Sequence, residues 1–183
     1  AQPFLCIVST GELLMLIGQI RYAPFEQTGT YDPVAQGIRY IHAGVKAIAL
    51  FTDVSVYNGG IDDLMFVARA VQSFDIPVIS QDFVFDEYQV VEARAAGAAG
   101  LVLDAGILDT DTLRALLSFT QRNRMTPIVR VGSEAELETA LALSPQVISL
   151  GSSPFTAESA DVALLSRLRT QIPSHINVMF SGE

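Results

Sequence analysis

The sequence predicts an α/β protein with a parallel sheet. Two features of the 183 residues lead to this expectation. Short apolar runs rich in Val, Ile and Leu alternate with amphipathic runs, and each gap between apolar runs can hold one helix. Such strict alternation is typical of parallel strands joined by right-handed helical crossovers.

Seven strands are expected, each a short apolar run of the kind found in sheets covered on both faces. They are Leu13–Arg21, Ala47–Thr52, Pro77–Phe83, Gly100–Asp104, Pro127–Val131, Val147–Leu150 and Asn177–Phe180.

Six connections between these strands each contain a predicted helix. Asp32 followed by Pro33 is typical of a helix start, and Ser133 with Glu136 forms a capping-box pattern. Arginines in the last turn of the longest helix suit its dipole. The expected helices are 32–44, Asp62–Ser73, Asp86–Gly97, Leu108–Arg124, Ser133–Leu143 and Ser159–Gln171.

Both a closed eight-fold barrel and an open, doubly wound sheet fit this order of elements. No G-x-G-x-x-G follows the first strand, which argues against a dinucleotide-binding fold. The length suits one core, so residues 1–183 are expected to form a single domain.

The composition excludes several classes of function. A net charge of −9 without a basic cluster argues against nucleic-acid binding. No apolar run reaches the roughly 20 residues of a transmembrane helix. The single cysteine, Cys6, offers no disulfide and no thiolate metal site, and no cofactor is expected. The start lacks a basic signal-peptide region, so a cytoplasmic location is expected.

Three stretches of the chain resemble the indole-3-glycerol-phosphate synthase family. "PVISQDFVFDEYQVVEARAAGAAGLVL" is similar to the family's strand-3, helix-3 and strand-4 region. "LFTDVSVYNGG" resembles its segment after strand 2, and "SEAELETALAL" its helix 5. The resemblance implies a TIM (βα)8-type barrel that closes and decarboxylates an anilino-ribulose phosphate in tryptophan biosynthesis.

The resemblance also implies that the family's catalytic side chains are replaced here. Gln19 and Arg21 stand at the glutamate and lysine of its E-I-K motif. Gln81 replaces the strand-3 lysine that acts as general acid, and Arg130 replaces the strand-5 glutamate. The full set of degenerate family positions is Gln19, Arg21, Gln81, Arg130, Gly151 and Phe180.

The residue types support this interpretation. The only lysine in the sequence, Lys46, precedes the second predicted strand, at the end of the barrel opposite the expected site. Glutamine cannot act as a general acid at neutral pH, and arginine keeps its proton there. His42 and His175 also fall away from the strand ends that would form the barrel mouth.

Two interpretations of the remaining polar residues stay open. Arg130 could form an internal ion pair with Asp104 on the neighbouring strand, because buried charges need partners. Alternatively, Arg21, Arg130 and Ser181 could bind a small phosphate or carboxylate. Asp53 and Asp82 also lie at strand ends, but no acid–base pair can be named among the aspartates.

The eighth strand has no candidate before the sequence ends at Glu183, and an open barrel would expose two strand edges. The chain could continue, another protein could supply the wall, or the sheet could close differently. We expect a catalytically inactive barrel that serves as a structural or binding subunit with other protein subunits. One alternative is an indole-3-glycerol-phosphate synthase, or a related phosphate-sugar lyase of tryptophan biosynthesis, with relocated catalytic residues. The other is a small-anion sensor.

Overall fold

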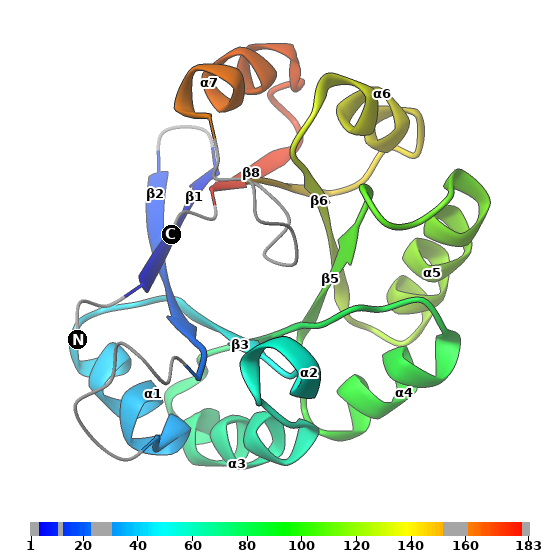
Figure 1. The fold of residues 1–183 in the computed structure, drawn as a ribbon. Helices are drawn as coiled ribbons and strands as arrows, with labels where there is room; N and C mark the ends of the chain where they lie inside the picture. Colours follow the sequence, from blue (N-terminus) through cyan, green and yellow to red (C-terminus); the bar gives the residue numbers. More distant parts are fainter. Residues whose placement is uncertain (1–3, 11–12, 23–30, 152–160, 181–183) are drawn as a thin grey trace.

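A computed structural model describes residues 4–10, 13–22, 31–151 and 161–180. Eight strands form a closed barrel in the order β1 to β8, surrounded by helices (Figure 1). The strands are β1 (Phe4–Thr10), β2 (Leu13–Ile20), β3 (Ala47–Phe51), β4 (Val78–Gln81), β5 (Gly100–Asp104), β6 (Thr126–Val131), β7 (Val147–Leu150) and β8 (Asn177–Phe180).

Strands β2 to β8 run parallel and correspond to the seven predicted strands. This arrangement confirms a TIM-type fold and excludes the open, doubly wound alternative. The predicted strand Pro77–Phe83 was too long at both ends, since β4 covers only Val78–Gln81. Its last two predicted residues, Asp82 and Phe83, instead begin the connection to the next helix.

The eighth place in the barrel is taken by β1, for which the sequence predicted no strand. β1 runs antiparallel to both β2 and β8, so it fills the gap without being a βα unit. Its pairing with β8 covers Ile7 to Ser9, opposite Phe180 to Val178. Of the three explanations for the missing strand, the described residues show a sheet that closes differently.

The helices occupy the connections in which they were predicted. They are α1 (Pro33–His42), α2 (Val54–Tyr57), α3 (Ile61–Val71), α4 (Glu87–Ala95), α5 (Thr110–Arg122), α6 (Glu134–Ala142) and α7 (Val162–Gln171), with a 3₁₀ turn, η1 (Gln72–Phe74). Asp32 caps α1 through the Ala35 N–H, and Ser133 caps α6 through the Glu136 N–H. The short α2 was not predicted.

The core has two parts because successive side chains of a strand point to opposite faces. One part fills the barrel and contains Ile17, Ala47, Ala49, Ile79, Val102, Ile128 and Met179. The other lies between the barrel and the helices, where Leu50, Leu101, Val129, Ile148 and Val178 are completely or almost completely buried. The alternation therefore decides which polar strand residues can reach the barrel mouth.

Candidate functional site

The candidate site is the barrel mouth, at the C-terminal ends of β2 to β8, where barrels of this type place their chemistry. Three buried polar residues meet there from β4, β5 and β6: Gln81, Asp104 and Arg130. Their exposed fractions are 0%, 4% and 2%. Asp104 lies directly opposite Arg130 in the β5–β6 register.

Arg130 joins these residues into one network. Its Nη1 lies 3.9 Å from Oδ2 of Asp104, and its Nη2 donates to Oε1 of Gln81 at 3.3 Å. The other Asp104 oxygen, Oδ1, accepts from the Gly106 N–H at 3.0 Å. The structure thus contains the internal ion pair considered from the sequence, with the Gln81 amide as a third member.

Gln19 and Arg21 lie on the opposite side of the barrel, because β2 and β6 are four strands apart in a ring of eight. Gln19 is buried, and its backbone carbonyl accepts from the Tyr40 hydroxyl at 2.9 Å. The half-buried Arg21 guanidinium lies 5.8 Å from the ring centre of Tyr57, a cation–π contact. Tyr57 in turn packs against Phe51, with ring centres 4.3 Å apart.

The predicted anion site of Arg21, Arg130 and Ser181 stays a prediction. Arg21 and Arg130 come from strands on opposite sides of the barrel, and Ser181 lies outside the described residues. The positive charge of Arg130 is balanced by Asp104, which weakens its attraction for a second anion.

The other two aspartates at strand ends have local structural roles. Asp53 caps α2 by accepting from the Val56 N–H at 2.5 Å. Asp82 accepts from the Thr52 hydroxyl and from the Phe83 N–H, each at 2.7 Å. Burial raises the pKa of Asp82 above its ordinary value, and these two hydrogen bonds oppose the rise.

Gly151 and Phe180 are the remaining two positions at which the family resemblance implies a replaced side chain. Gly151 is buried directly after β7, and its N–H donates to the Val131 carbonyl at 3.1 Å. Phe180 packs against the cluster between barrel and helices, whereas its neighbour Met179 fills the barrel. Because faces alternate along β8, a side chain at position 180 is directed away from the mouth.

Ser149 is a mouth residue that the sequence analysis missed. It is fully buried on β7, directly opposite Arg130 in the β6–β7 register. Val147, two residues earlier on the same strand, packs against the barrel interior. Because side chains alternate between faces with a period of two, this spacing could have predicted that Ser149 lies on the inner face.

The remaining candidates for proton transfer or metal binding lie away from the mouth. Lys46 is exposed just before β3, at the base of the barrel, and His42 and His175 are exposed near the ends of α1 and α7. Among the described residues, no group of three His, Cys, Asp or Glu side chains could hold a metal ion. Within the same ranges, no helix is long and apolar enough to cross a membrane.

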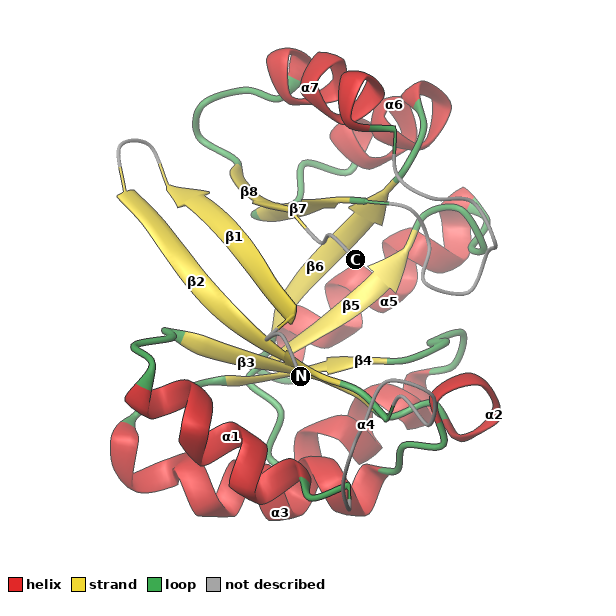
Figure 2. Cartoon of the chain, turned by 60° about the vertical axis from the view of Figure 1, so that its left-hand side comes forward, coloured by secondary structure: helices red, strands yellow, loops and turns green. Residues whose placement is uncertain are grey.

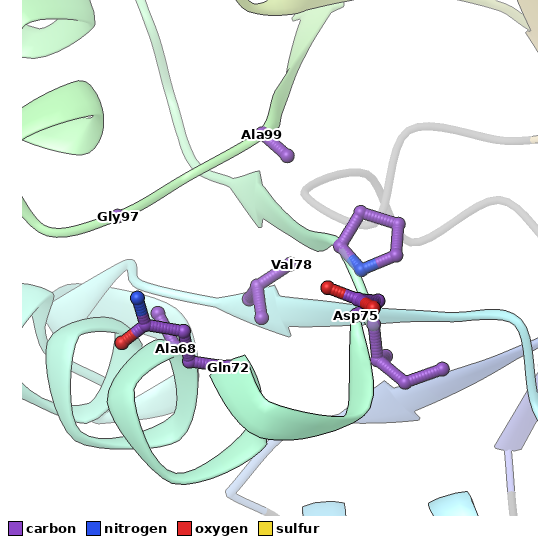
Figure 3. Close-up of a pocket in the computed structure, with 8 residues that line it drawn as sticks. Ala68, Gln72, Asp75, Val78, Gly97 and Ala99 are labelled. Atoms are coloured by element: carbon purple, nitrogen blue, oxygen red, sulfur yellow. The ribbon is translucent and has the colours of Figure 1, made fainter.

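A hollow of about 440 Å³ opens at the base, beside the start of β4 (Figure 3). It is lined by the end of α3, by η1 and Asp75, and by the α4–β5 connection, mainly through Ala68, Gln72, Asp75, Val78, Gly97 and Ala99. Because β4 begins here and ends at the mouth, the hollow and the network around Arg130 are at opposite ends of the barrel. The hollow therefore has no part in the mouth site.

Known proteins are similar to this chain in sequence and in fold. The family described as "Indole-3-glycerol phosphate synthase" matches residues 27–182. The indole-3-glycerol phosphate synthase of Oceanobacillus iheyensis is 28% identical over 181 residues, covering 97% of this chain and 68% of that protein. The enzyme of the same name from Mycolicibacterium smegmatis is 34% identical over 145 residues, covering 79% of this chain and 52% of that protein.

The chain thus spans between about half and two thirds of the length of these two curated relatives. A solved structure of N-acetylmannosamine-6-phosphate 2-epimerase from Clostridium perfringens is also similar, with a TM-score of 0.62 and 15% identity. That likeness covers 86% of this chain and 72% of the epimerase and supports the fold alone. From the match over residues 27–182, the chain belongs to the indole-3-glycerol phosphate synthase family.

Proposed function

We propose that this barrel has lost the ring-closing and decarboxylating activity of its family and serves as a structural or binding subunit of a larger protein assembly. The proposed loss of activity rests on one observation, the Gln81–Arg130–Asp104 network. It occupies the positions at which the family resemblance implies a lysine acid and a glutamate.

The network is unsuited to acid–base catalysis. The Gln81 amide cannot donate a proton as a general acid near neutral pH, and the Arg130 guanidinium keeps its proton. The Asp104 carboxylate is already engaged by Arg130 and by the Gly106 N–H. Arg130 lies where the resemblance implies a glutamate, so the charge at that position is also reversed.

The subunit role is supported by the composition of the whole chain and by its exposed apolar side chains. Half of the residues are hydrophobic and only 17% are charged, compared with about 25% in typical soluble domains. Large apolar side chains such as Val54, Phe85, Tyr88 and Val162 are more than 65% exposed. Apolar surface of this kind is suited to burial against another protein chain.

The activity test uses the anilino-ribulose phosphate substrate implied by the family resemblance. We expect no indole fluorescence from this chain, while the Mycolicibacterium smegmatis relative, under the same conditions, serves as the positive control. Turnover that disappears in Arg21→Ala or Gln81→Ala would establish relocated catalytic residues and overturn the proposal.

A second candidate function is the binding of a small anion at the mouth. Among the described residues, Nε2 of the fully buried Gln81 has no hydrogen-bond acceptor. A bound phosphate or carboxylate oxygen could accept from this amide. Titration with inorganic phosphate should then raise the unfolding temperature of the wild type and not of Gln81→Leu. No thermal shift in the wild type would reject this function.

A further inference from the structure

The strands β1 and β2 form a hairpin ribbon that is longer than the sheet beside it. β2 pairs with β1 over seven residue pairs, from Phe4–Gln19 to Thr10–Leu13. Its pairing with β3, in contrast, begins only at Ile17. Residues 13–16 of β2 therefore extend past the start of β3, and Figure 2 shows the ribbon projecting from the base of the barrel.

One hydrogen bond shows which backbone groups face the open side of this extension. The Lys46 N–H donates to the Leu16 carbonyl at 2.8 Å, so the backbone groups of Leu16 are directed to the β3 side. Because these directions alternate along a strand, the N–H and C=O of Leu14 face the same side, and those of Met15 face β1. The described pairing of β2 with β3 begins only at Ile17, so it does not reach Leu14.

The ribbon lacks the usual protection of an edge strand. Neither β1 nor β2 contains a charged residue or a proline. Natural edge strands are commonly protected by charges, prolines or bulges, because unpaired backbone groups recruit another strand. The extension itself reads Leu-Leu-Met-Leu, and Leu16 is 40% exposed.

We infer that the Leu13–Leu16 edge pairs with the same edge of a second copy of this chain. An antiparallel edge is complementary to itself about a two-fold axis. With the axis beside Leu14, the Leu14 N–H of each copy donates to the Leu14 carbonyl of the other. The Leu16 carbonyl is already occupied by Lys46, which limits how far the two strands can overlap.

Charge also favours this contact between identical chains. Each chain has a net charge of −9, so most faces of two copies repel one another. The ribbon is uncharged, and the charged residue that bonds to its edge, Lys46, is cationic. The strands that would meet therefore carry no carboxylate of their own. This inference rests on the subunit role proposed above and identifies a partner for it.

Sedimentation equilibrium of the purified chain tests the pairing. We expect a mass twice that of the 19.7 kDa chain. Leu14→Pro removes the N–H beside the axis but leaves the β1 pairing, which uses Met15, so the dissociation constant should rise at least about tenfold. Leu14→Val keeps the N–H and should dimerise like the wild type.

Leu16→Lys provides a second test if Leu14→Pro does not fold, because it places a charge at the exposed edge and should also shift the dimer to monomer. Thermal unfolding confirms that each variant is folded. A wild-type monomer across the concentration range, a dimer that neither variant weakens, or large heterogeneous particles would each overturn the inference. None of these results changes the indole assay, so failure of the inference is distinct from failure of the inactivity proposal.

Discussion

Replacing Arg130 by methionine is expected to destabilise the barrel strongly. The side chain is 2% exposed, and its guanidinium lies beside the equally buried Asp104 carboxylate. Methionine has a similar length but no charge, so the variant leaves a buried anion without its cationic neighbour. Arg130→Met therefore tests whether the ion pair in the barrel mouth contributes to folding.

The magnitude follows from the separation of the two groups. At 3.9 Å between Nη1 and Oδ2, unit charges attract by about 4 kcal/mol at an effective dielectric constant of about 20. Loss of hydration offsets much of this attraction in the wild type, but removing one partner alone costs about 3–5 kcal/mol. Asp104→Leu should cost a similar amount, and the double variant should return to within about 1 kcal/mol of the wild type.

Urea unfolding followed by circular dichroism measures these differences as a double-mutant cycle. The matched control is Arg114→Met, which removes an exposed ion pair with Asp111 at 2.6 Å. That control should change the unfolding free energy by less than about 1 kcal/mol. If the losses of Arg130→Met and Asp104→Leu simply add in the double variant, the two residues are not coupled and the reasoning is refuted.

Two further predictions concern a glycine at the base and a carboxyl near the mouth. Gly97→Ala should destabilise the chain in urea unfolding by about 1–3 kcal/mol, because Gly97 has φ +101° and the added Cβ would lie 2.9 Å from the Cβ of Ala68. Gly44→Ala, with φ +88° and nothing within 4 Å of the added carbon, should cost less; equal losses would exclude the Ala68 contact as a cause. Burial raises the pKa of Asp82 in the folded state, so its contribution to stability is complete below its ordinary pKa of 3.8 and is lost as pH rises through the raised value. Asp82→Asn should flatten this part of the stability–pH curve, and an unchanged curve would show that Asp82 does not cause it.

The strand positions could be predicted largely because their signal is local. Gly100–Asp104, Val147–Leu150 and Asn177–Phe180 coincide with the observed strands, since each is a short apolar run between turn residues. The helix α2 was missed because it has only four residues and leads into Asn58, in a left-handed conformation. A single helical turn lacks the periodic pattern on which prediction depends.

The candidate site could be predicted only in part. The Arg130–Asp104 pair followed from charge, because two buried charges on adjacent strands need each other. The separation of Arg21 from Arg130 depends on the order of the strands around the closed barrel. The spacing of residues along the sequence does not predict that order. The contact of Arg21 with Tyr57 also depends on the unpredicted helix α2.

The sequence by itself determined the seven parallel strands and the six helices predicted between them, because apolar runs and capping residues specify strands and helices within a few residues. Only the tertiary structure decided how the barrel closes. β1 pairs with β8 through hydrogen bonds between opposite ends of the chain, and it runs antiparallel to the strands on both sides. No local sequence pattern in Phe4–Thr10 predicts that this segment pairs with β8. Seven parallel strands leave two strand edges with unpaired backbone N–H and C=O groups. β1 pairs with both edges because an extended apolar segment within reach can supply the missing hydrogen bonds.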